Sequence, residues 1–250
     1  VLKLDLNGDT IWTKCFGGSL YEYGCSLLGL DDNGFMLIGE TRSNDGDVSG
    51  FHGKSDYWVA RIGSAGSLVW QKCFGGSDRD RPYDISKGHN HSYLITGFTA
   101  SNDGDVSGNH GFDDVWVVEI DTNGNIKNKK CFGGSSVDWG YRSLSLNLKY
   151  FVFGNTSSLN GDVSGKNGGT DVWYFSIDSN FNISNQLCLG GGGAEGLRGF
   201  GFDAELTNDK GIIFTTSSDS SDGDVPGNNG QYDVWVVKLC FTPGIEIKSA

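Results

Sequence analysis

The feature that most constrains this chain is a five-residue phrase that recurs along it at a nearly constant step. CFGGS begins at Cys15, Cys73 and Cys131, which lie 58 residues apart, and a degenerate copy, CLGGG, begins 57 residues later at Cys188. A fixed period of this length indicates tandem structural units, each too small to bury a core alone, that stack against their neighbours.

Each unit contains four segments with the composition of short β-strands. In one unit these segments are Cys25–Leu30, Phe35–Thr41, Tyr57–Ile62 and Leu68–Phe74. Asn-Gly pairs in the intervening turns are typical of tight hairpins, because both central residues of such a turn need positive φ. No sustained 3.6-residue apolar period occurs, so we expect no long helix. The sequence therefore predicts an all-β fold, a β-propeller of four repeats of about 58 residues, each a four-stranded antiparallel blade; a β-solenoid is the structural alternative.

The repeats form one predicted domain, residues 1–250. Its units are approximately 1–57, 58–115, 116–172 and 173–239, followed by a divergent tail at 240–250. Because the chain starts inside a repeat, it fits a fragment of a longer protein as well as a ring that closes by self-association.

Composition excludes several classes of function. The net charge is −12, from 31 acidic and 19 basic residues, whereas a nucleic-acid binder needs clustered Lys and Arg to displace counterions. No segment approaches the roughly 20 apolar residues of a membrane helix. We therefore expect no nucleic-acid partner and no membrane span.

Four of the six cysteines recur at one repeat position, which is not the pattern of a disulfide framework. They are expected to be small buried side chains. Cys25 and Cys240 fall outside the series, and the sequence leaves open whether they pair.

The loop between the second and third strands carries the most informative chemistry. Its first copy reads DGDVSG from Asp45 and reaches Asp56 at the twelfth position. Oxygens at positions 1, 3, 5 and 12 are the ligand spacing of a calcium loop, and glycine at position 6 permits the sharp turn. Aspartates beside glycines also form Asx turns with no metal, so both interpretations stay open.

Calcium is the one cofactor that this pattern predicts. The first two copies are the better candidates, because Asn160 removes one charge from the third and Pro226 removes a ligand from the fourth. The candidate metal ligands are Asp45, Asp47, Ser49, Asp56, Asp103, Asp105, Ser107, Asp114, Asn160, Asp162, Ser164, Asp171, Asp222, Asp224 and Asp233.

No residue is predicted to be catalytic, since the chain has no GxSxG elbow, HExxH pair or phosphate-binding loop. Propeller glycosidases and sialidases place paired carboxylates, or Tyr and Arg, at the mouth of the channel. Such residues depart from the repeat, and charged solvated turns account for most departures. The departures that stand out are Asp78, Arg79, Asp80, Arg81, Glu195 and Arg198.

Several recurring elements carry a resemblance to a known family. They are the GGS turn, a second strand that ends in Gly-x-Thr (Gly39, Gly97, Gly154), a Gly-x-x-Asp-x-Trp lead into the third strand, and the hairpin Leu4–Gly8. The unit resembles the seven-bladed β-propeller (SBBP) type repeat of secreted and surface proteins of Bacteroidetes. The resemblance implies export and surface display but no reaction, and the four units here depart from seven.

From these observations we expect a non-catalytic β-propeller, secreted or on the cell surface, that acts as a binding, adhesion or scaffold module. Its partners would be a protein or glycan ligand, the rest of a larger chain, or a second copy. Calcium would stiffen its loops. The alternative is a carbohydrate-active hydrolase or lectin that uses loops at the ends of the blades.

Overall fold

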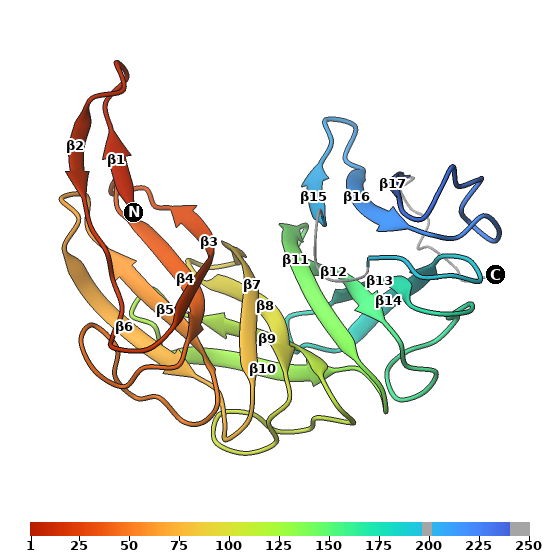
Figure 1. Ribbon diagram of the computed structural model, residues 1–250, viewed down its shortest axis with the longest axis horizontal. Coiled ribbons are helices and arrows are strands. Elements are labelled where there is room, and N and C mark those ends of the chain that lie inside the picture. The colour runs from red at the N-terminus through yellow and green to blue at the C-terminus, as the bar shows by residue number, and fades with distance from the viewer. Residues whose placement is uncertain (197–201, 241–250) are drawn as a thin grey trace.

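The computed structural model describes residues 1–196 and 202–240, and every helix or strand element within these ranges is a β-strand. Five antiparallel sheets follow one another along the chain in an arc (Figure 1). The first is a two-stranded hairpin, the next three have four strands each, and the last has three.

The strand bounds repeat with the sequence. The hairpin consists of β1 (Leu2–Leu4) and β2 (Thr10–Thr13). The first four-stranded sheet consists of β3 (Glu22–Gly29), β4 (Phe35–Thr41), β5 (Asp56–Ile62) and β6 (Leu68–Phe74), and the second of β7 (Asp80–Lys87), β8 (Tyr93–Thr99), β9 (Asp114–Ile120) and β10 (Ile126–Phe132). The third consists of β11 (Asp138–Leu146), β12 (Lys149–Thr156), β13 (Asp171–Ile177) and β14 (Ile183–Leu189), and the last sheet of β15 (Asp203–Leu206), β16 (Ile212–Ser218) and β17 (Asp233–Leu239).

The all-β class and the four-stranded antiparallel unit are confirmed. The expected division into four blades of four strands is wrong in its count, because five sheets are present and two of them have fewer strands. The hairpin corresponds to the third and fourth strands of a unit, and the last sheet to the first three strands. Among the described strands, no pairing joins β17 to β1 or β2.

The first strands of successive sheets lie beside one another on the inner side of the arc (Figure 1). Side chains connect them directly. Ser86 Oγ on β7 lies 2.9 Å from Ser143 Oγ on β11. Arg142 on β11 reaches Asp84 on β7 at 2.8 Å and Asp203 on β15 at 3.1 Å. The inner strands therefore bring residues of different repeats within contact distance.

Apolar packing between adjacent sheets forms the core, because each strand turns alternate side chains to opposite faces. At the first junction the fully buried ring of Tyr57 on β5 lies 4.7 Å from the ring of Trp116 on β9, and its hydroxyl donates to the Trp116 carbonyl at 3.2 Å. Val115 occupies the Tyr57 position at the next junction and is also fully buried. At the end of the arc, the equivalent Val234 is 79% exposed, so this face of the last sheet is uncovered.

A glycine in the second strand makes this packing possible. A Cβ on Gly97 would collide with the Arg81 carbonyl and would lie 2.5 Å from the Tyr57 hydroxyl. The strand position that packs under the neighbouring aromatic therefore has no room for a side chain.

We predict that Gly97→Ala lowers the free energy of unfolding by about 2 kcal/mol, because the backbone must move to admit the methyl group. Denaturant unfolding at equilibrium measures the change. Gly24→Ala is the matched control, since a Cβ there meets no atom within 4 Å. Equal effects of the two substitutions would contradict the packing argument.

Candidate functional site

The first acid of each predicted calcium loop caps the glycine-rich turn that precedes the sheet. Asp45 Oδ1 accepts from the Ser19 backbone N–H at 2.8 Å, and Asp103 Oδ1 accepts from that of Ser77 at 2.7 Å. These N–H donors lower the pKa of both carboxyls. The side chains of Asn160 and Asp222 cap the corresponding turns in the later copies. One structural role therefore accounts for this position in all four loops.

The third and fifth loop positions are also engaged with the protein. Asp47 Oδ2 accepts from the Gly17 backbone N–H at 3.2 Å, and Asp162 Oδ2 accepts from that of Gly133 at 3.3 Å. Ser49 Oγ accepts from Gln71 Nε2 at 2.6 Å. The side chains at positions 1, 3 and 5 of one loop thus form hydrogen bonds with three different residues of the protein.

The twelfth position begins the third strand and is the most buried of the set. Asp56 and Asp114 each accept from a histidine four residues earlier, through its backbone N–H and its ring Nδ1. The other carboxylate oxygen, Oδ1, is buried without a hydrogen-bond partner in Asp56, Asp114 and Asp171. Within residues 1–196 and 202–240, no group of three or more His, Cys, Asp or Glu side chains gathers around a point that could hold a metal ion.

Calcium binding stays a prediction, and thermal unfolding decides it. If a loop binds Ca²⁺ in the folded state alone, millimolar Ca²⁺ raises the Tm above its value in chelator, and Asp47→Asn reduces that rise. Mg²⁺ at the same ionic strength is the control for general salt effects. Identical melting curves with and without chelator would rule the ion out.

The buried acids at the twelfth position bear on stability through their protonation. Burial raises the pKa of Asp114 to about 6, although His110 opposes the shift. Between its ordinary pKa and 6, the folded state keeps a proton that the unfolded state has lost. Its contribution to stability is therefore fully present at lower pH and is lost as the pH rises through 6.

We predict that Asp114→Asn is more favourable at pH 8 than at pH 5, because the amide removes a buried charge that exists only at the higher pH. The measurement is the difference in Tm between variant and wild type at both values. Asp121→Asn is the control whose effect should be the same at both values, because N–H donors of Asn125 lower the pKa of that exposed carboxyl and it is ionised at pH 5 as well as at pH 8. A difference for Asp114→Asn that does not change with pH would contradict the assignment.

A second group of polar and aromatic residues lies where the inner strands begin, and three sheets contribute to it. We call it the mouth cluster. Its members are Glu40, Arg42, Arg79, Arg81, Tyr83, Phe98, Asp113, Trp139 and Tyr141.

Two buried carboxylates define the charged part of the mouth cluster. Glu40, at the end of β4, accepts from Arg42 Nε at 3.1 Å and Nη2 at 3.0 Å. Asp113, just before β9, accepts from Trp139 Nε1 at 3.0 Å and from Arg79 Nη2 at 3.3 Å. Both residues are 4% exposed. Each buried carboxylate therefore has a guanidinium group as its partner.

Aromatic rings connect the two charged parts. The ring of Tyr83 lies 5.0 Å from that of Tyr141 and 6.1 Å from that of Phe98, and Phe98 lies 5.2 Å from Trp139. Arg81 lies over the Tyr83 ring at 5.3 Å. The rings therefore form a continuous surface from the second sheet to the third.

β-Bulges place the two tyrosines. The register of β7 shifts between Pro82 and Asp84, and that of β11 shifts between Gly140 and Arg142. A bulge adds one unpaired residue and re-aims its side chain, here Tyr83 and Tyr141. Proline is tolerated at such a point because no ladder hydrogen bond is lost.

The environment of Tyr83 keeps its phenol protonated. Burial raises the pKa, and Arg81 opposes this effect. The charges of Glu40 and Asp113 add to the rise, so both carboxylates act on the same phenol. The mouth cluster thus combines two buried carboxyl groups with a hydroxyl that carries a proton.

The sequence identified part of this cluster. Arg79 and Arg81 were noted as departures from the repeat, whereas Glu40, Asp113 and Trp139 were missed. A usable signal was the middle residue of Gly-x-Thr, which is Glu40 in one unit and Phe98 in the next.

The other departures have structural roles or lie elsewhere. Asp80 is fully buried and accepts from the Gly76 N–H at 2.8 Å, and Glu195 accepts from Ser218 Oγ at 2.8 Å. Asp78 pairs with Lys54 at 3.0 Å on the surface. Arg198 lies outside the described residues.

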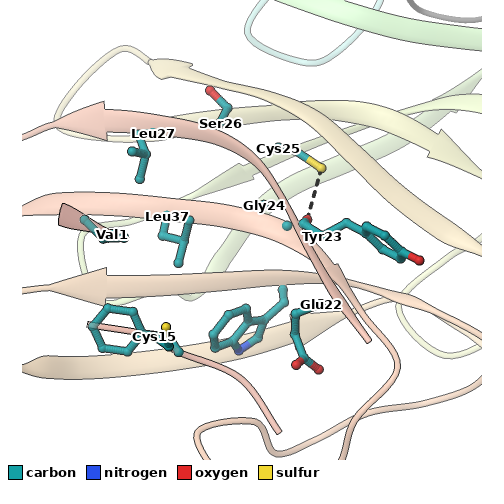
Figure 2. Close-up of a pocket in the computed structure, with 12 residues that line it drawn as sticks. Val1, Cys15, Glu22, Tyr23, Gly24, Cys25, Ser26, Leu27 and Leu37 are labelled. Atoms are coloured by element: carbon teal, nitrogen blue, oxygen red, sulfur yellow. Dashed lines mark hydrogen bonds between the residues drawn. The ribbon is translucent and has the colours of Figure 1, made fainter. Parts of the chain in front are cut away.

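A cavity of about 570 Å³ lies against the first four-stranded sheet, and none of its lining residues belongs to the mouth cluster. Figure 2 shows Tyr23 and Cys25 at its edge, with Cys25 Sγ 3.4 Å from the Tyr23 carbonyl oxygen. At the next junction, Tyr57 fills the equivalent space against Trp116. The cavity is therefore the uncovered side of a sheet junction. Cys25 and Cys240 are both free thiols, as are the other four cysteines.

No family model and no curated protein matches the chain. Among solved structures, it is similar to a thermostable family-43 glycoside hydrolase, with 14% identity and a TM-score of 0.49 over 92% of this chain and 75% of that chain. It is also similar to a mutant of the Synechocystis apocarotenoid oxygenase (12% identity, TM-score 0.44, 94% and 53%). A mutant of the B. megaterium levansucrase gives 10% identity and a TM-score of 0.42 over 87% and 65%. The chain spans between half and two thirds of the last two structures.

The sequence led us to expect a non-catalytic secreted or cell-surface binding or scaffold module, whereas these solved structures include a glycoside hydrolase and a levansucrase, so that expectation is withdrawn. Identities this low bear on the fold alone, so no substrate, reaction or residue role is transferred to this chain. The described residues also contain no helix long and apolar enough to cross a membrane.

Proposed function

We propose that this chain is an arc of a β-propeller that acts as a carbohydrate-active hydrolase at the mouth cluster. The observation that carries the proposal is the pair of buried carboxylates, Glu40 and Asp113. Neighbouring sheets contribute them, and both act on the Tyr83 phenol. Hydrolysis of a glycosidic bond needs a carboxylate as base or nucleophile and a second group that donates a proton.

The chemistry of the cluster matches those two tasks. Glu40 and Asp113 are carboxylates paired with arginines, and a carboxylate is the group that attacks the sugar or activates a water molecule in such a reaction. Burial raises the pKa of Tyr83, so the phenol keeps its proton and can donate a hydrogen bond to the leaving oxygen. Half-buried Trp139 and the 47% exposed Tyr23 offer flat faces for sugar rings.

The propeller arrangement is supported by the sheet junctions. Three successive junctions bury equivalent positions, and inner strands of different sheets meet at the mouth cluster. The uncovered Val234 and Val236 at the end of the arc occupy positions that the internal junctions bury. We propose that further sheets, from a longer chain or from a second copy, cover this face. The extracellular or cell-surface location expected from the sequence belongs to the same proposal.

The test is release of reducing sugar from a panel of oligosaccharides, together with calorimetric titration of each one. We expect Glu40→Gln and Asp113→Asn to lower kcat/KM at least 100-fold on any cleaved member, in line with the loss of a general acid or base. Asp31→Asn, in an exposed turn between β3 and β4, is the control that should keep full activity. The Tm of each variant separates lost chemistry from lost folding.

Activity that persists in both carboxylate variants would contradict the assignment of the site. Binding without cleavage would reduce the proposal to a lectin. A panel that is neither bound nor cleaved would overturn it.

A further inference from the structure

Arginine is concentrated at one place in this acidic chain. The chain has six arginines, and Arg42, Arg79 and Arg81 all belong to the mouth cluster. The buried carboxylates there are two, Glu40 and Asp113. The cluster therefore has one arginine more than it has carboxylates, in a protein whose net charge is −12; Asp78 and Asp80, which flank Arg79, pair with Lys54 and with the Gly76 N–H.

The repeat does not require these arginines. Tyr23 and Trp139 occupy the position of Arg81 in the neighbouring units, and Tyr21 and Val137 occupy that of Arg79. All these strands form with the same pairing whichever residue is present. The guanidinium groups thus serve a task at one point of the arc.

Arg81 interacts with Glu40, with the Cys25 thiol and with the Tyr83 ring, but its Nε donates no hydrogen bond to the described residues. Arg42 and Arg79 donate hydrogen bonds to Glu40 and Asp113. Arg81 Nε lies 3.6 Å from Glu40 Oε2, beyond hydrogen-bond distance, and is buried with no hydrogen-bond partner among the described residues. An unpaired buried donor is costly, and this one belongs to a side chain that is 40% exposed.

The position of Arg81 suits a planar anion. Its guanidinium carbon lies 5.3 Å from the centre of the Tyr83 ring, which holds the group beside the phenol. A guanidinium recognises a carboxylate through two parallel hydrogen bonds, whereas lysine offers a point charge. A neutral sugar hydroxyl would accept one hydrogen bond and would leave the charge of the additional arginine unbalanced.

We infer that the saccharide bound at the mouth cluster is acidic, and that Arg81 binds its carboxylate. This inference rests on the proposed function. A uronic acid and a sialic acid both present a carboxylate on a pyranose ring, so they share the chemistry that the cluster recognises.

The experiment compares matched acidic and neutral probes. Tetragalacturonate and sialyllactose are titrated into the intact chain beside their methyl esters, which keep the shape of the sugar and remove the charge. We expect at least one free acid to bind ten-fold or more tightly than its ester. Arg81→Gln should abolish that preference, and Arg81→Lys should restore only part of it. Arg61→Gln, whose guanidinium pairs with Asp32 away from the mouth cluster, is the control.

The outcomes distinguish this inference from the proposed function. If free acids and esters bind equally and Arg81→Gln leaves both unchanged, the site binds saccharides but Arg81 only neutralises Glu40, and the inference is overturned. If no acidic or neutral saccharide binds, the proposed function fails as well. A folded Arg81→Gln variant with unchanged Tm and no preference for acids supports the inference.

Discussion

The packing of an aromatic or branched side chain against a strand that carries glycine is the contact on which the whole structure depends. At the first junction, Tyr57 reaches the backbone of Trp116 because Gly97 has no side chain. At Gly154 the nearest contacts of a Cβ lie within its own sheet instead, where it would collide with the Trp139 carbonyl. A four-stranded unit is a single layer and cannot cover its own apolar faces, so each sheet is stable only when a neighbour covers it.

Because the junctions use the middle of each sheet, the inner ends of the strands are free to vary. The first acid of the β4–β5 loop caps the glycine-rich turn in every unit, and this cap holds the start of each inner strand in one place. Residues one or two positions away can then differ without cost to the fold. Arg81, Trp139 and Tyr23 share one structural position and have three different chemistries. A repeated framework thereby supports a site that is not repeated.

The sequence predicted the elements well because the repeat multiplies the signal. Phe35–Thr41 and Leu68–Phe74 were placed with their observed bounds, and the third strand missed only Asp56. The first strand was placed less well, as Cys25–Leu30 instead of Glu22–Gly29, because the β-bulge at Cys25 breaks its alternation. The number of sheets was wrong for a different reason. The spacing of a sequence repeat gives the length of one unit, but it does not show at which strand of the unit each sheet begins.

The site was harder to predict because its residues are defined by what they meet across sheets. Asp113 immediately precedes an acid of the repeat and reads as part of the same loop. Its place in the mouth cluster depends on hydrogen bonds from Trp139 Nε1 and Arg79, which lie in other parts of the chain. Conversely, the loop acids at calcium spacing stood out because they recur, and recurrence is what a turn cap also produces. In a tandem repeat, residues that recur in every unit chiefly stabilise the fold. Candidate functional residues are therefore best sought at the positions where the units carry different residues.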